Sequence, residues 1–187
     1  MPPSSVTRRD FLQNVSVAGI AMLASVHTSS VVAAESMPEV KKAVFICSRC
    51  GHIEFGTAPG QCPVCHAPKD QFNRSDSIFS DTAAKFKDVN DKHIPVIRAK
   101  KVSSPVTEKP SISMEAKIGS VIHPMEEAHH IQFIDCYIDD VHACRVSLTV
   151  RNHPTAGIDI KVPAKKSVRV VVLCNLHGYW QSEAVPV

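Results

Sequence analysis

Short runs in which apolar and polar residues alternate make up much of the second half of the chain. The run SISMEAKIG places Ile112, Met114 and Ile118 on one face of a strand, and HIQFIDCYI, ACRVSLTV and GIDIKV alternate in the same way. A period of two residues is typical of a strand with one buried face. The β-branched run VRVVVL, which leads to Cys174, predicts a buried strand. Turn residues separate these runs, so the pattern predicts an all-β sandwich over 90–187.

The N-terminal segment 1–34 has the pattern of an export signal. Arg8 and Arg9 precede the apolar stretch VSVAGIAMLASV, and small residues then lead to Ala34 and a plausible cut before Glu35. The paired arginines are typical of the twin-arginine signal, which exports folded proteins. An amphipathic first helix is the alternative, but the segment has no polar stripe. We therefore expect a periplasmic protein that has no membrane segment after cleavage.

Composition narrows the class of protein only slightly. The chain has 187 residues and a formal net charge of +3, so nucleic acid is not an expected partner. The polar stretch over 76–89 reads as a linker with one helical turn. The remaining information lies in the spacing of seven cysteines and ten histidines.

Four of the cysteines form two CxxC pairs. Cys47 and Cys50 make the first pair and Cys62 and Cys65 the second, with eleven residues between the pairs. Thiolates at this spacing can close a tetrahedron around one ion, whereas two disulfides are the alternative in an exported protein. Paired CxxC units are seldom disulfide frameworks, so we predict a metal site. Iron and zinc both accept four thiolates, and the spacing leaves the choice open.

The segment CSRCGHIEFGTAPGQCPVCHAPKDQF resembles the short rubredoxin domain of rubrerythrins, which shares GHI, APxxCPVC and the closing Phe72. The resemblance covers about 42–75. It implies a small metal-knuckle domain with one iron that passes single electrons, and a zinc ribbon is the competing interpretation. His52 and His66 stand beside the cysteine pairs, and we expect both at the surface.

Five further metal-capable residues are spread over the predicted sandwich. They are His93, His123, His129, Cys174 and His177. A single histidine in a strand is usually structural. Most of these five stand beside Pro, Gly or Asn, where strands end, and together they favour a second metal site.

The motifs DKHIPVI, HPMEEAHHI and CNLHGYW resemble those of the superoxide reductase family, also called desulfoferrodoxin and neelaredoxin. The resemblance spans 90–182 and implies an immunoglobulin-like β-sandwich with an iron held by four equatorial histidines and one axial cysteine. Carried onto this sequence, the ligands are His93, His123, His129 and His177, with Cys174 axial. His130 stands where an aromatic residue is usual, and we expect it beside the site.

The resemblance also implies an enzyme that reduces superoxide, O2•− + e− + 2H+ → H2O2, with the thiolate pushing electron density toward the bound oxygen. Lys92 precedes the first ligand and would attract the anion and help supply a proton. The family usually has Glu-Lys-His where this chain has Asp91-Lys92-His93. In the family this glutamate can be the sixth ligand of oxidised iron. Asp91 stands at its position as a candidate catalytic residue, but its side chain is one methylene shorter, which leaves that ligation open.

Together the two resemblances imply two irons per chain, with zinc as the alternative at the four-cysteine site. They imply superoxide as substrate and a small exported redox protein as electron donor. The rubredoxin-like centre would be either an electron relay or a redox-idle structural domain, and the sequence leaves both open. We also expect a homo-oligomer. Two other classes fit the motifs: an electron carrier whose histidine-rich site is closed to substrate, and a zinc-ribbon and sandwich binding module without redox chemistry.

No metal site requires Cys136 or Cys144. The run FIDCYIDDVHACRVSL predicts two strands around a turn near Asp139 and Asp140. A turn centred on Asp140 places the two cysteines opposite each other, near enough for a disulfide, whereas a turn one residue later places them on diagonal rungs. A protein that folds in the cytoplasm before export keeps buried thiols reduced. We therefore predict two free cysteines.

Overall fold

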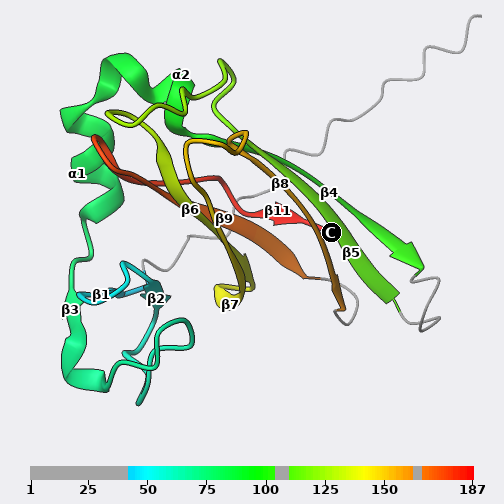
Figure 1. Ribbon diagram of the computed structural model, residues 1–187. Helices are drawn as coiled ribbons and strands as arrows, with labels where there is room; N and C mark the ends of the chain where they lie inside the picture. The colour runs from blue at the N-terminus through cyan, green and yellow to red at the C-terminus, as the bar shows by residue number, and fades with distance from the viewer. Residues whose placement is uncertain (1–41, 104–109, 162–165) are drawn as a thin grey trace, which may run out of the picture. The chain divides into compact units, whose positions relative to one another are not determined.

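The computed structural model describes residues 42–103, 110–161 and 166–187. The expected export signal over 1–34 lies outside these ranges, and so does Val162 at the end of the run GIDIKV. Within these ranges no helix is long and apolar enough to cross a bilayer. Most regular structure is strand, arranged in two larger sheets and one small sheet (Figure 1). This confirms the mainly β class predicted from the alternating runs.

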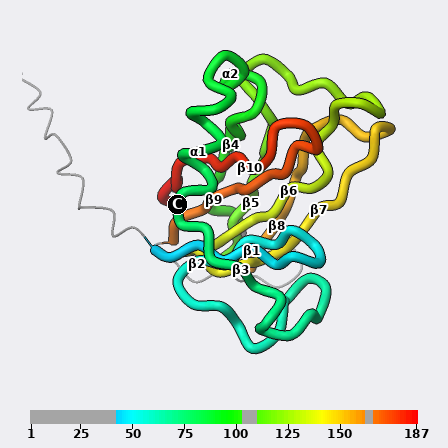
Figure 2. The backbone as a smooth tube through the Cα atoms, turned by 90° about the vertical axis from the view of Figure 1, so that its left-hand side faces the viewer, coloured from blue at the N-terminus to red at the C-terminus, as the bar shows by residue number. Residues whose placement is uncertain are grey.

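The sandwich is made of a five-stranded sheet and a three-stranded sheet. The five strands of the first are β6 (Ile131–Ile138), β7 (Val141–Ser147), β9 (Ser167–Cys174), β10 (Gly178–Gln181) and β11 (Val185–Pro186). The second contains β4 (Pro95–Ser103), β5 (Pro110–Ile118) and β8 (Thr155–Lys161). The order β10-β9-β6-β7 can be followed in Figure 2, and β11 also pairs with β9. The order of the second sheet is β4-β5-β8, and the neighbouring strands of both sheets run antiparallel.

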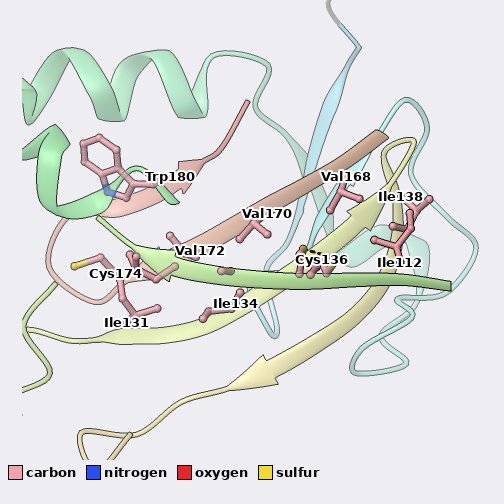
Figure 3. Close-up of a cluster of buried hydrophobic side chains, with 13 residues drawn as sticks. Ile112, Ile131, Ile134, Cys136, Ile138, Val168, Val170, Val172, Cys174 and Trp180 are labelled. Carbon is pink, nitrogen blue, oxygen red and sulfur yellow. Dashed lines mark hydrogen bonds between the residues drawn. The ribbon is translucent and has the colours of Figure 1, made fainter. Parts of the chain in front are cut away.

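The core lies between these two sheets and contains the apolar positions of the alternating runs. Ile112 of β5 packs into one cluster with Ile134 of β6 and with Val170 and Val172 of β9 (Figure 3). All four side chains are at most 2% exposed. Burying an aliphatic side chain of this size stabilises the fold by about 1.5–3 kcal/mol. The core therefore holds β9 rigidly along its length.

A small sheet with the order β2-β1-β3 precedes the sandwich. Its strands are β1 (Val44–Cys47), β2 (Ile53–Phe55) and β3 (Phe72–Arg74), with the 3-10 helix η1 (Lys69–Gln71) before β3. Val44 and Ile53 of this sheet form a second buried cluster with Tyr137 of β6 and Val171 of β9. Val171 points away from the main core, so β9 has apolar cover on both faces. This explains why the second half of the strand, from Val170 to Leu173, is a continuous apolar run instead of an alternating one.

The expected linker over 76–89 contains more structure than one helical turn. It forms the eight-residue helix α1 (Ile78–Lys85) and the 3-10 helix η2 (Lys87–Val89), which lead into α2 (Asn90–His93). Ala83 and Phe86 pack against the main core, while Ile78 and Phe79 pack against the second cluster. A helix this short is marginal alone and takes its stability from such packing, which the local sequence does not reveal.

The β6–β7 hairpin explains the position of the two remaining cysteines. Asp139 and Asp140 have φ values of +49° and +64°, as in a two-residue type I′ turn. That turn alone would offset Cys136 from Cys144. A bulge beside Tyr137 corrects the register, so the two cysteines are directly paired across the strands. Both are free cysteines, and the Cys136 Sγ lies 3.7 Å from the Met114 Sδ.

We expect both thiols to remain free in the mature protein, since Cys136 is fully buried where an oxidant cannot reach it. The measurement is mass spectrometry of protein that is denatured and alkylated without reductant. Both cysteines should carry the label. Recovery of an unlabelled peptide pair linked by a disulfide would contradict this prediction.

Candidate metal centres

The four cysteines of the CxxC pairs converge at one end of the small sheet. The Sγ atoms of Cys47 and Cys65 are 3.7 Å apart, and those of Cys50 and Cys62 are 3.6 Å apart. All four sulfur atoms lie within 4.8 Å of one another. Four thiols at these separations suit a tetrahedral ion of iron or zinc.

Both cysteine pairs use the same backbone turn. The Gly51 N–H donates to the Cys47 carbonyl at 2.8 Å, and the His66 N–H donates to the Cys62 carbonyl at 3.0 Å. Gly51 and His66 have φ values of +70° and +59°, the left-handed conformation that turns the chain behind the second thiol. At Gly51 a Cβ atom would also lie 2.7 Å from the Tyr179 hydroxyl, so only glycine fits there. His66 is exposed, as expected.

The second predicted set of donors comes from four places in the sandwich. His93 ends α2, His123 and His129 lie in the segment between β5 and β6, Cys174 ends β9, and His177 lies in the turn before β10. Cys174 lies with Trp180 at one end of the core cluster, and its sulfur points away from the apolar side chains (Figure 3). The strand therefore holds the thiol at the edge of the core.

The structure brings these five donors together. The His93 Nε2 lies 3.1 Å from the His123 Nε2, 2.9 Å from the His177 Nδ1 and 3.5 Å from the His129 Nε2. The Cys174 Sγ lies 3.7 Å from the His177 Nδ1. The donor atoms of His93, His129, Cys174 and His177 all lie within 4.8 Å of one another, and His123 joins them through His93.

Hydrogen bonds fix the orientation of two of the imidazoles. The His93 Nδ1–H donates to the Val89 carbonyl at 2.8 Å, and the His123 Nδ1–H donates to the Pro124 carbonyl. Because a carbonyl only accepts, each ring carries its proton on Nδ1 when neutral and leaves a lone pair on Nε2. The two Nε2 lone pairs face each other at 3.1 Å. Such an arrangement is unfavourable without a cation between them, and it fits a metal that neutral imidazole binds.

Burial keeps these imidazoles neutral. Burial lowers the pKa of His93 and of His123 from 6.5 to about 4, and the neighbouring histidines add to the effect. The pKa values of His129 and His177 are also lowered, chiefly by burial. The uncharged form is the one that ligates a metal. Conversely, burial raises the pKa of the Cys174 thiol, so formation of the thiolate depends on a nearby positive charge.

Asn175 joins the two motifs that carry most of the donors. Its Oδ1 accepts from the His130 N–H at 2.8 Å, and its Nδ2 donates to the Ala128 carbonyl at 3.2 Å. The backbone N–H groups of Leu176 and His177 donate to the Cys174 sulfur and favour its thiolate. The sequence CNLH therefore supplies a ligand pair together with its supporting hydrogen bonds, a role for Asn175 that the motif alone does not reveal.

The residues predicted to flank the site lie where the sequence indicates. Asp91 and Lys92 are exposed on α2, next to the buried His93. The Asp91 carbonyl accepts from the Ser120 Oγ at 3.1 Å, which ties α2 to the segment that leads to His123. His130 follows His129 in the chain, and its Nδ1 lies 3.1 Å from the Glu126 carbonyl.

One expectation about a histidine was wrong. His52 is not at the surface but fully buried, where its ring stacks 6.2 Å from that of Tyr137. The second cluster covers it together with Asp135 of β6 and His142 of β7, and these three residues form a further group of potential ligands. The sequence gives no signal for this group, because its members come from segments about 80 residues apart.

The chain matches the desulfoferrodoxin family over residues 85–183 and the rubredoxin-like domain of rubrerythrin over residues 45–73. A desulfoferrodoxin homolog from Methanothermobacter thermautotrophicus is 31% identical over 140 residues, which cover 73% of this chain and 94% of that protein. The chain belongs to the desulfoferrodoxin family. The family match contains all five donors of the sandwich site, and the rubredoxin-like match contains all four cysteines of the CxxC pairs.

Other members of the desulfoferrodoxin family carry names that state an activity. The superoxide reductase of Pyrococcus abyssi is 29% identical over 104 residues, which cover 50% of this chain and 85% of that protein. The solved structure of the superoxide reductase from Nanoarchaeum equitans aligns at 25% identity with a TM-score of 0.44, and the alignment covers 52% of this chain and 94% of that chain.

Cys174→Ser should keep the fold of this desulfoferrodoxin and abolish any thiolate-to-iron absorption from the sandwich site. Serine is nearly the same size, but it does not supply the soft thiolate donor. The measurement is the visible spectrum of iron-loaded protein, with circular dichroism to check the fold. Cys144→Ser is the matched control and should leave the spectrum unchanged. An unchanged spectrum in Cys174→Ser would remove this residue from the ligand set.

Metal-free protein should lose stability as the pH falls from about 6.5 to about 4. In this window the unfolded chain protonates histidines at a pKa near 6.5, whereas buried His93 and His123 resist protonation until about 4. The unfolded state therefore binds more protons than the folded state, and the free energy of unfolding decreases as the pH is lowered. Urea midpoints measured across this range should fall less steeply in His93→Gln, and exposed His153→Gln should match the wild type. A flat wild-type midpoint would refute the prediction.

Proposed function

We propose that this chain is a superoxide reductase, in which His93, His123, His129, His177 and Cys174 hold a catalytic iron. The observation that carries the proposal is the convergence of imidazole lone pairs at 2.9–3.5 Å around His93, with a thiol 3.7 Å from His177. When bound, iron would supply the single electron that converts superoxide to hydrogen peroxide, O2•− + e− + 2H+ → H2O2. The names of several relatives support this choice of substrate.

The residues around the donors suit a small anionic substrate. Trp180 stacks on the His93 ring at 4.8 Å and Phe86 packs edge-on against the His177 ring at 4.8 Å, so the core side of the site is closed by aromatic rings. Lys92, by contrast, is exposed beside His93. Its positive charge attracts an anion from solvent, and its ammonium group holds a proton that the product requires.

We further propose that the four-cysteine centre relays electrons to the sandwich site. Two polar contacts support this role. The Tyr179 hydroxyl donates to the Gly51 carbonyl at 3.1 Å, and the Arg145 Nη1 donates to the Cys50 carbonyl at 2.8 Å. Tyr179 is two residues after His177 in the chain. A short path of covalent and hydrogen bonds thus leads from a cysteine of one site to a histidine of the other.

The cellular setting follows from the sequence. We propose export by the twin-arginine route, which fits a protein that takes up its metals in the cytoplasm before it crosses the membrane. In the periplasm a small redox protein would donate electrons, and the protein would assemble as a homo-oligomer.

Anaerobic addition of superoxide to reduced protein tests the proposed activity. The enzyme should oxidise rapidly and release one hydrogen peroxide per superoxide consumed. Slow oxidation without stoichiometric peroxide would favour an electron carrier. Metal analysis of protein expressed with iron and zinc available tests the other alternative: two zinc ions per chain in place of iron would favour a binding module without redox chemistry.

Lys92→Ala should slow superoxide capture by about 3- to 10-fold at low ionic strength and flatten the dependence of the rate on salt, because a screened attraction is lost. Pulse radiolysis of the reduced enzyme at several salt concentrations measures both effects. Lys100→Ala, which removes an exposed charge from β4, is the matched control and should change the rate little. Equal rates for Lys92→Ala and wild type at low salt would show that Lys92 does not guide the substrate.

A further inference from the structure

A third group of potential ligands lies on the outer face of the five-stranded sheet, under the small sheet. It consists of His52 immediately before β2, Asp135 on β6 and His142 on β7. The side chains of His52 and Asp135 are fully buried, and that of His142 is 10% exposed. Neither proposed centre uses these side chains.

The hydrogen bonds of His52 leave a lone pair pointing at a carboxylate. Its Nε2 lies 3.1 Å from the Glu54 Oε2, and a carboxylate oxygen accepts, so Nε2 carries the hydrogen. In the neutral ring Nδ1 is then an acceptor, and it faces the Asp135 Oδ2 at 3.6 Å without any hydrogen-bond partner. The buried His142 Nε2 faces the Asp135 Oδ1 at 3.6 Å and also has no hydrogen-bond partner. These atoms lack the partners that buried nitrogen atoms normally have.

The separations fit a shared ion better than direct hydrogen bonds. A separation of 3.6 Å exceeds the roughly 2.7–3.2 Å of an N–H···O bond. Two ligand atoms that each lie about 2.0–2.2 Å from a tetrahedral ion are instead about 3.3–3.6 Å apart. The sulfur atoms of the four-cysteine site show the same spacing, at 3.6 and 3.7 Å. In both groups the atoms are too far apart to bond strongly and near enough to surround a metal.

The surrounding groups support Asp135 as a ligand. Burial raises its pKa, but two hydrogen bonds from Arg145, at 2.6 Å each, hold the pKa far below its usual range. Arg145 uses one lone pair of each carboxylate oxygen, and the Tyr137 hydroxyl lies 3.5 Å from Oδ2 as a further donor, so Oδ1 is the oxygen that keeps a lone pair available. Asp135, Glu54 and Arg145 together carry one net negative charge, which a divalent ion would reverse only to one net positive charge. A carboxylate held by donors and an imidazole held by a carboxylate are typical supports of metal ligands.

We propose that His52, Asp135 and His142 form a third metal site, which binds a divalent transition ion such as zinc and fastens the four-cysteine unit to the sandwich. Two imidazoles and one carboxylate are a ligand set that zinc accepts, with water as the fourth ligand. The ion would join β2 to the β6–β7 hairpin. The proposed superoxide chemistry does not depend on it, so the two proposals can fail separately.

Zinc binding to the full-length chain tests the proposal. Protein saturated with zinc and then dialysed should retain one more zinc per chain than His142→Gln prepared in parallel. His153→Gln replaces an exposed histidine outside all three groups and should retain as much as the wild type. Loading with cadmium adds a second readout, because a nitrogen- and oxygen-ligated ion resonates far from thiolate-ligated ions in the cadmium NMR spectrum. That resonance should be absent from His142→Gln.

Equal zinc content in wild type and His142→Gln would overturn the proposal, and so would the same spectrum in both. Such a result would mean that His52 carries a proton on both ring nitrogens, facing Glu54 and Asp135, and that no ion is bound there.

If circular dichroism shows that His142→Gln does not fold, Glu54→Gln is used in its place. This variant keeps every ligand but weakens the support of His52, and zinc affinity at this site should fall by about 10- to 100-fold. An unchanged affinity would also overturn the proposal.

Discussion

Tyr137 and Val171 point outward from the sandwich and are still fully buried, because Val44 and Ile53 of the small sheet cover them. This apolar contact removes water from the outer face of β6, where Asp135 also lies. A buried carboxylate is costly unless it is paired, and Arg145 pairs with it through two hydrogen bonds. The same guanidinium then reaches the Cys50 carbonyl. The small sheet thus buries Asp135, which requires the ion pair with Arg145, and Arg145 in turn holds the turn that carries Cys50.

On the opposite face of the same sheet, the packed core holds the strand ends that carry the histidine-rich site. Precise ligand positions require rigid supports, and strand ends next to a packed core provide them. Cys174 is the last residue of β9, and Asn175 immediately ties the chain to the segment that carries His129. The five donors therefore come from distant parts of the chain, but each is held within one or two residues of a regular element or of a fixed hydrogen bond.

The strands and the four-cysteine cluster could be predicted from the sequence, because alternation and CxxC spacing are local properties. The five donors of the sandwich site are far apart in the chain, and only the resemblance of their motifs to the family implied that they belong together. The two-turn helix α1 could not be predicted, since Phe79 and Phe86 explain it only through their packing on separate clusters. His52 was misplaced for a similar reason. A histidine beside a metal turn is usually exposed, and only the tertiary fold brings Asp135 and His142 to it. The bulge that aligns Cys136 with Cys144 also depends on tertiary context, because nothing in the run FIDCYIDDVHACRVSL marks it.

Successive side chains of β9 point to opposite faces of the sheet, and this has an evolutionary consequence. Val168, Val170, Val172 and Cys174 share the inner face, while Val171 and Leu173 face the small sheet and its Gly51 turn. Because side chains alternate, inserting or deleting one residue in this strand would turn the residues beyond it to the opposite face. An insertion would place Leu173, and a deletion Asn175, where the thiol belongs. Substitutions of similar size can accumulate along β9 without this effect. We therefore expect lineages that keep the histidine-rich centre to vary in the composition of this strand and hardly at all in its length.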